Sequence, residues 1–122
     1  MTAIVKAMRL VILESPYAGN IEENVAYARA CVRDSLSRGE APIASHLLYT
    51  QPGVLRDEVA EGRQWGIDAG LAWSSKAEAT VVYTDRGISR GMEYGIANAE
   101  RAGRPIERRT LLALSLHDRG AP

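Results

Sequence analysis

The sequence predicts a small α/β domain, a Rossmann-like doubly wound parallel sheet of about four to five strands with helices on both faces. Two observations predict this fold. Short apolar runs rich in branched residues alternate with segments of helical periodicity, and this alternation is typical of right-handed βαβ units. The composition is that of a globular protein, with 46% hydrophobic and 25% charged residues. The 122 residues suit one domain over residues 1–122.

The first strand and helix have the clearest signals. Residues 7–13 form a short apolar run, as a buried central strand does. Asn20 then caps a helix, with Glu23 at capping-box spacing, and Gly39 ends it. Helical spacing predicts a buried stripe on this helix formed by Ile21, Val25, Ala28, Val32 and Leu36.

The middle of the chain has a looser pattern. Residues 42–48 predict a second strand, and the β-branched residues 79–84 predict a third. Between them, residues 54–75 are helical in pattern but contain three glycines. We therefore expect one kinked helix or two short ones there.

The last elements again have clear boundaries. A third helix should begin at Ser89 as its N-cap and end at Gly103. Its buried side is expected to consist of Met92, Ile96 and Ala99. Pro105 begins a short fourth strand, which should lie at an edge because proline cannot donate to a ladder. The apolar residues 111–116 predict either a short helix or a surface for self-association.

Charge and cysteine content exclude several classes of protein. Basic and acidic residues balance at 15 each, so we expect no binding to nucleic-acid polymers. The single cysteine, Cys31, excludes an internal disulfide and the usual Cys-rich zinc sites, which suits a cytoplasmic protein. No run approaches the roughly 20 apolar residues of a membrane span. We expect no membrane partner and no cofactor.

In a doubly wound sheet, ligands bind beyond the carboxyl ends of the strands. This rule selects the loops at residues 15–20, 45–51 and 85–93. In the first loop, Gly19 permits close approach of the backbone, and the helix that starts at Asn20 offers free N–H groups to an anion. Ser15 and Tyr17 add hydroxyls. A tight turn with a capping Asn is an equally good interpretation, and no Walker or G-x-G-x-x-G motif is present.

The loop at 85–93 leads into a helix with a carboxylate, Glu93, in its first turn. An acidic residue at that position can simply stabilise the helix by interacting with its dipole, or it can be held over the ligand as a glycosyl-transfer nucleophile. His46 follows the second strand and is either a packing residue or a ligand contact. Asp68 and Arg63 are expected to be solvated helical charges, and His117 a solvated tail residue. No metal-ligand cluster and no Ser-His-Asp order stand out.

Five segments carry a resemblance to a known family. They are Ser15-Pro-Tyr-Ala-Gly-Asn20, Pro42-Ile-Ala-Ser-His-Leu-Leu-Tyr-Thr-Gln51, Val82-Tyr-Thr-Asp85, Gly87-Ile-Ser-Arg-Gly-Met92 and Gly103-Arg-Pro-Ile-Glu-Arg108. Together they resemble the nucleoside 2-deoxyribosyltransferase-like superfamily, and more closely a set of uncharacterised small phage and bacterial proteins related to it. The resemblance to the enzymes themselves rests mainly on Glu93-x-Gly95-x-Ala97.

The resemblance implies recognition of a nucleoside or nucleotide and cleavage or exchange of its N-glycosidic bond. Glu93 would attack the anomeric carbon, and Asp68, with Asp85 as a rival, would support departure of the base. The implied ligand contacts are Ser15, Tyr17, Gly19, Asn20, Ser45, His46, Asp85, Gly87, Ser89, Gly91 and Met92. Related enzymes form dimers or larger oligomers, so a homo-oligomer is expected.

A second alignment remains open at the third loop. It places the family's glutamate two residues later, at Gly95, and then Glu93 is a surface residue and the nucleophile is missing. The corresponding hypothesis is a non-catalytic protein that sequesters or senses a nucleotide, such as an ADP-ribose-like signal if the gene is viral.

Overall fold

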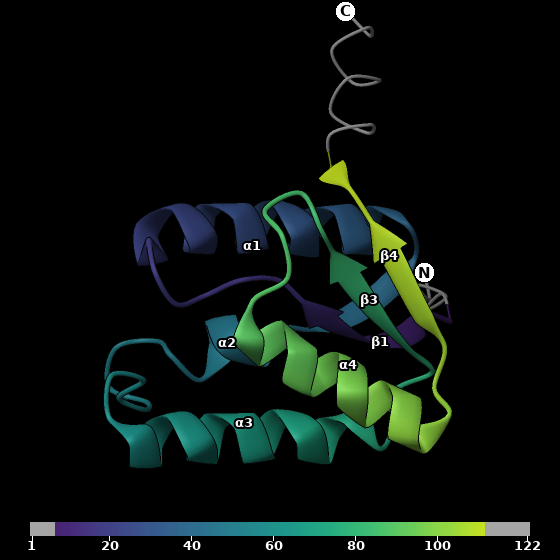
Figure 1. Ribbon diagram of the computed structural model, residues 1–122. Helices are drawn as coiled ribbons and strands as arrows, with labels where there is room; N and C mark the ends of the chain where they lie inside the picture. The colour runs from purple at the N-terminus through teal and green to yellow at the C-terminus, as the bar shows by residue number, and fades with distance from the viewer. Residues whose placement is uncertain (1–6, 112–122) are drawn as a thin grey trace, which may run out of the picture.

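The computed structural model describes residues 7–111, which form a four-stranded, all-parallel sheet (Figure 1). The strands are β1 (Arg9–Glu14), β2 (Glu40–Ile43), β3 (Ala79–Tyr83) and β4 (Ile106–Arg109), in the spatial order β2-β1-β3-β4. Ile12 pairs with Ile43 on one side and with Thr80 on the other. The predicted α/β class, parallel sheet and edge position of the fourth strand are confirmed.

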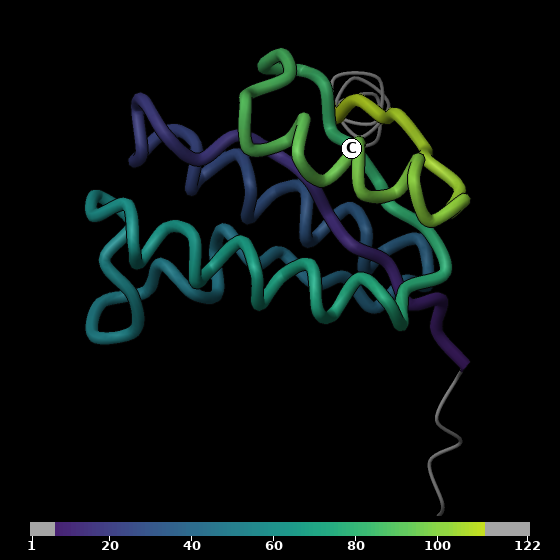
Figure 2. Tube along the Cα trace, turned by 60° about the horizontal axis from the view of Figure 1, so that its bottom comes forward, coloured from purple at the N-terminus to yellow at the C-terminus, as the bar shows by residue number. Residues whose placement is uncertain are grey.

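Helices cover both faces of the sheet (Figures 1 and 2). They are α1 (Ile21–Ser37), the single turn α2 (Ser45–Leu48), α3 (Ala60–Ser74) and α4 (Arg90–Ala102). The connection from β1 leads to its neighbour β2 on one side, whereas the connections from β2 to β3 and from β3 to β4 lead across the sheet in the opposite direction. Right-handed crossovers therefore put α1 on one face and α3 and α4 on the opposite face. The direction reverses between β1 and β3, and beyond the carboxyl ends of these strands such folds bind ligands.

The α1 face of the sheet is closed by a packed core and a buried ionic network. The core includes Val11, Leu13 and Val81. In the network, Arg109 Nη2 lies 2.5 Å from Glu40 Oε2, and both side chains are at most 7% exposed. Arg109 also donates to the Tyr83 hydroxyl, which donates to Asp34 at 2.6 Å. The network thereby connects α1 to both edge strands.

This network explains why the buried face of α1 differs from the predicted stripe. Asn20 caps the helix as expected, accepting from the Glu23 N–H, but Glu23 turns its carboxylate to Arg86 instead of completing a capping box. Ile21 and Leu36, predicted to be buried, are 47% and 49% exposed. The residues of α1 that are buried are Asn24, Ala28, Cys31, Asp34 and Ser35. Hydrogen bonds compensate much of the burial of the polar members of this set: Ser35 and Asp34 bond to the sheet residues Glu40 and Tyr83, and Asn24 bonds to the loop that precedes the helix.

Two further boundaries differ from the prediction. The second strand ends at Ile43, and residues 45–48, predicted as strand, form α2. The segment predicted as a kinked or divided helix is one continuous helix, α3, preceded by turns. Its glycines do not interrupt it, because they occupy a packed face described below.

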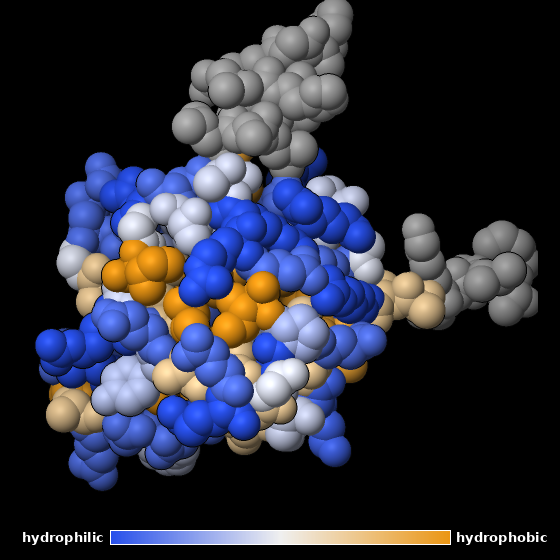
Figure 3. Space-filling view, turned by 45° about the vertical axis from the view of Figure 1, so that its right-hand side comes forward, coloured by the Kyte–Doolittle hydropathy of each residue, from blue (hydrophilic) through white to orange (hydrophobic). Residues whose placement is uncertain are grey.

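The final helix and strand agree closely with the sequence. Ser89 Oγ accepts from the Met92 N–H at the start of α4, and Gly103 ends the helix with a φ of 68°. Ile96, predicted to be buried, is only partly so, and Gly95 is buried instead. On the side that includes β4 the surface is mainly hydrophilic around a small apolar patch (Figure 3). Residues 112–122, which include most of the apolar stretch 111–116 and also His117, lie outside the described residues, as do residues 1–6.

Candidate functional site

A cavity of about 460 Å³ lies between the sheet and helices α2, α3 and α4. β1 and β2 contribute their last residues, Glu14 and Ile43, so the cavity includes the switch-point end of the sheet, while Thr80 near the start of β3 lines its other end. Its apolar walls are Ile12, Ile43, Leu55, Ile67, Leu71 and Met92, and its tyrosines are Tyr17, Tyr49 and Tyr94. This volume is within the range of small-molecule sites, roughly 300–1,000 Å³.

The glycines of α3 form the wall of this cavity that faces α2. Gly62, Gly66 and Gly70 are spaced by four and all line the cavity. A Cβ at Gly70 would lie 2.8 Å from the Ser45 Cβ, and one at Gly66 would touch Leu55. The glycines therefore let α2 and its following loop approach α3 closely, which is why they do not break the helix.

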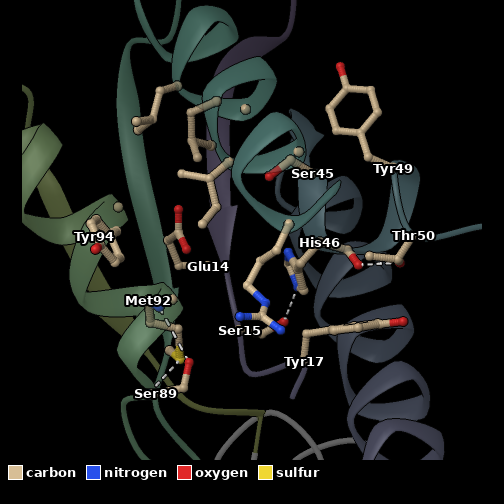
Figure 4. Close-up of a pocket in the computed structure, with 18 of the residues that line it drawn as sticks. Glu14, Ser15, Tyr17, Ser45, His46, Tyr49, Thr50, Ser89, Met92 and Tyr94 are labelled. Atoms are coloured by element: carbon tan, nitrogen blue, oxygen red, sulfur yellow. Dashed lines mark hydrogen bonds between the residues drawn. The ribbon is translucent and has the colours of Figure 1, made fainter. Parts of the chain in front are cut away.

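Glu14, the last residue of β1, places its carboxyl group in the middle of the cavity. Figure 4 shows it between Met92 on α4 and Ser45 and His46 on α2. The carboxyl lies against Gly95, where the Cβ of any other residue would overlap it. Among the described residues it has no hydrogen-bond partner. Burial raises the pKa of Glu14 to about 8, although the Arg104 charge acts in the opposite direction. Glu14 is therefore mostly a neutral carboxylic acid at pH 7.

Ser15 and His46 form a second polar element of the cavity. The Ser15 Oγ lies 2.6 Å from His46 Nε2, as the dashed line in Figure 4 marks. Burial lowers the pKa of His46 to about 4, so the ring is neutral over the physiological range. The pair therefore adds hydrogen-bonding groups to the cavity without adding charge.

The opposite end of the cavity is organised by Arg104. Its guanidinium donates to Thr80 Oγ1 at 3.0 Å, to the Ser74 carbonyl at 3.0 Å and to Asn98 Oδ1 at 2.5 Å. Ser74 Oγ donates to the same Asn98 oxygen at 3.0 Å. Each of the three guanidinium nitrogens thus donates one hydrogen bond within the cluster.

Several residues predicted to contact a ligand do line the cavity. They are Ser15, Tyr17, Ser45, His46, Ser89, Gly91 and Met92. Arg63, predicted to be a solvated charge, is exposed and also contributes to the lining.

The two predicted catalytic carboxylates are not among the lining residues. Glu93 is exposed on α4, one residue beyond Met92. Asp68 is exposed and accepts from Gln64 at 2.8 Å. Because it is two residues from both Gly66 and Gly70, it lies on the opposite side of α3 from the glycine face.

The remaining predicted residues have other positions. Asp85, Gly87 and Ser89 line a shallower depression beside the cavity. The Asp85 carboxylate accepts from the Tyr27 hydroxyl at 2.6 Å and from the Leu111 N–H at 2.9 Å, so it connects α1 to the end of β4. Gly19, with a φ of 101°, and the N-cap Asn20 shape the start of α1 and line neither hollow.

The cavity residues missed by the sequence reasoning include Glu14, Asn98 and Arg104. Glu14 could have been found from alternation, since it shares the face of Ile12 and follows it by two residues at the carboxyl end of a buried strand. Asn98 could have been found from helical spacing, because it follows Gly95 by three residues and therefore lies on the same inner side of the helix. Arg104 follows a helix-ending glycine, and no sequence signal directs its side chain inward.

Residues 9–109 match the family described as a domain of unknown function (DUF7768), and the chain belongs to this family. No curated protein and no solved structure matches the chain. The similarity to nucleoside 2-deoxyribosyltransferases stays a prediction. In residues 7–111 no helix has the length and apolar character needed to cross a membrane.

Proposed function

We propose that this DUF7768 domain binds a nucleoside or nucleotide in the Glu14 cavity and cleaves or exchanges its N-glycosidic bond. The observation that carries the proposal is the Glu14 carboxyl, neutral and unpartnered among the described residues, in a cavity of suitable size at the switch point. A carboxyl whose pKa is raised by burial is the group that acid-catalysed glycosyl chemistry requires.

The chemistry follows from the protonation state of Glu14. Its O–H gives a proton to the base while the C1′–N bond breaks, and the electron pair of that bond leaves with the base. Water attacks the sugar carbon and returns its proton to the Glu14 carboxylate. In an exchange reaction a second base attacks instead, and its ring N–H returns the proton. Asp57, which also lines the cavity, can stabilise the positive charge that develops on the sugar.

The cavity also offers suitable groups for the rest of a nucleotide. Tyr17, Tyr49 and Tyr94 provide aromatic faces for a base or sugar. Arg63 and Arg90 line it on the exposed side, and Arg90 and Gly91 belong to the first turn of α4, where free N–H groups favour a phosphate.

This proposal moves the reacting glutamate from Glu93 to Glu14. Glu93 is exposed and outside the lining, whereas Gly95 leaves room on α4 that the Glu14 carboxyl occupies. Under the alternative alignment the family's glutamate falls at Gly95. A carboxyl supplied from β1 then stands beside the position where that alignment expects one from α4.

A non-catalytic nucleotide-binding protein, which sequesters or senses a signal such as an ADP-ribose derivative, is the second candidate. The position of Glu93 and Asp68 outside the cavity favours it, because neither predicted catalytic carboxylate then reaches the ligand. The same cavity serves both candidates.

The test compares wild type, Glu14→Gln and Glu93→Gln. Each is incubated with nucleosides, their 5′-monophosphates, the deoxy forms and ADP-ribose, and free base is followed by chromatography. We expect base release by wild type and Glu93→Gln and its loss in Glu14→Gln. Release that depends on Glu93 instead would refute the role of Glu14. Tight binding with no release from any variant would support the second candidate.

A further inference from the structure

Hydrogen-bonding groups in a cavity that no protein atom satisfies indicate what a ligand must offer. Most polar side chains here are already paired: Ser15 with His46, and Arg104 with Thr80, Ser74 and Asn98. Several lining groups have no hydrogen-bond partner among residues 7–111, and two of these, the Glu14 carboxyl and the Asn98 amide nitrogen, lie on the inner side of α4.

The orientation of the Asn98 amide is fixed by its neighbours. Arg104 can only donate, so the Asn98 atom 2.5 Å from its Nη2 must be the carbonyl oxygen. Ser74 donates to the same oxygen at 3.0 Å. The NH₂ group therefore points away from this cluster, and Asn98 lines the cavity. It offers two donors and no acceptor to a ligand.

Glu14 and Asn98 act on the same inner side of α4. The Glu14 carboxyl touches Gly95, and Asn98 follows Gly95 by three residues, a helical spacing that puts Cβ positions about 5–6 Å apart; the carboxyl therefore lies beside the Asn98 position. A planar ligand edge can span both. The neutral carboxyl supplies one donor and one acceptor, and Asn98 adds a donor beside them.

We infer that Glu14 and Asn98 together read one edge of the nucleobase, and that the site selects adenine, uracil and thymine over guanine, hypoxanthine and cytosine. The inference rests on the proposed function. In our assignment, the Glu14 O–H faces an acceptor whose protonation assists departure of the base: N7, across C8 from the glycosidic nitrogen of a purine, or O2, on the carbon bonded to the glycosidic nitrogen of a pyrimidine.

The rest of the order then follows. Along the edge of the base, the first position is the acceptor that faces the Glu14 O–H. The second position must be a donor, which faces the Glu14 carbonyl oxygen, and the third must be an acceptor, which faces the Asn98 NH₂ group. Adenine presents N7, N6–H and N1, and uracil and thymine present O2, N3–H and O4, so all three offer acceptor, donor, acceptor. Guanine and hypoxanthine present N7, O6 and N1–H, and cytosine presents O2, N3 and N4–H. These place an acceptor against the Glu14 carbonyl and a donor against Asn98.

Binding to Glu14→Gln by calorimetry tests this selection without turnover, because glutamine keeps one donor and one acceptor. Adenosine, uridine and thymidine should bind more tightly than guanosine, inosine and cytidine by on the order of 10- to 100-fold, the usual effect of mismatched buried polar groups. 7-Deazaadenosine, which lacks N7, should bind more weakly than adenosine by the same factor, and 3-methyluridine, which lacks N3–H, more weakly than uridine. If guanosine, inosine or cytidine binds as tightly as adenosine, the inference is wrong and the proposed function stands. If no nucleoside or nucleotide binds wild type or variant, both are refuted.

Asn98→Asp separates ligand recognition from structure. Aspartate keeps the oxygen that Arg104 and Ser74 hold, so thermal unfolding should show no loss of stability, but it removes the donor. The affinity of Asn98→Asp for adenosine and thymidine should fall on the order of 10- to 100-fold, and its affinity for guanosine and cytidine should change less. Gln64→Glu makes the same amide-to-acid change on the exposed side of α3 and should leave the ratio of affinities unchanged. An unchanged ratio in Asn98→Asp would assign Asn98 a structural role only.

Discussion

Replacing Glu14 by glutamine should stabilise the protein by an amount that depends on pH. The pKa of this carboxyl rises from 4.5 to about 8 on folding. Between these values the unfolded chain gives up a proton that the folded protein keeps, so stability falls as pH rises, by about 1.4 kcal/mol per pH unit. Glutamine has the same shape and does not titrate. At pH 7 the variant should therefore be more stable than wild type by about 3 kcal/mol, and below pH 4.5 the difference should vanish.

Urea unfolding of wild type and Glu14→Gln at a series of pH values from 4 to 8 measures this difference. Because the other titrating groups are common to both proteins, they cancel in the comparison. Glu93→Gln is the matched control, since it changes an exposed carboxylate on the neighbouring helix and should alter stability by less than about 0.5 kcal/mol. A difference between wild type and Glu14→Gln that is the same at every pH would refute the reasoning, as would a variant less stable than wild type at pH 8.

Three further predictions follow from other contacts. Gly95→Ala puts a methyl group where the Glu14 carboxyl lies and should lower the free energy of unfolding by about 1–3 kcal/mol. In a Glu14→Ala background the loss should be much smaller, and equal losses in this double-mutant cycle would contradict the contact. Arg109→Met removes the closest cation from the buried Glu40, which keeps only Ser35 and the more distant Arg9, and should cost up to about 3–5 kcal/mol at pH 7. Burial alone raises the pKa of Glu40, but its bonds to Arg109 and Ser35 lower the pKa overall. The destabilisation caused by Arg109→Met should therefore shrink as pH falls below 4.5. Acid unfolding in which the difference between wild type and variant does not shrink would contradict this prediction. The His46 ring should titrate near pH 4 by NMR, with folded stability lost as pH falls from 6.5 towards 4, and a midpoint near 6.5 would show that the ring is solvated.

The fold was predictable from the sequence because its signals are local. The β-branched run at 79–84 and the Ser89 and Gly103 boundaries of α4 each depend on a few adjacent residues. Where the prediction was wrong, distant contacts decided the outcome. The glycines of α3 are breakers by propensity, yet they are needed for the approach of α2. Likewise, the burial of Asp34 in α1 is stabilised by Tyr83, on a distant strand, which donates to it together with Arg38.

The candidate site was predictable only in its location. Strand ends selected loops whose residues line the cavity, and Ser15 and His46, both expected near the ligand, are in hydrogen-bond contact. Which carboxylate enters the cavity was not predictable from the loop pattern, because Glu93 and Glu14 both lie beside these loops. The helical phase of α4 turns Glu93 to solvent, while the pleat of β1 turns Glu14 inward.

The contact between Glu14 and Gly95 also constrains how the family can vary. One position is on a strand and the other on a helix, yet a side chain at the second forces the carboxyl of a glutamate at the first out of its place. Members that keep glycine at position 95 are free to retain the carboxyl as it lies here, and members that gain a side chain there must move, shorten or lose it. The two positions should therefore covary across the family, and a lineage that changes one without the other would have rearranged its cavity.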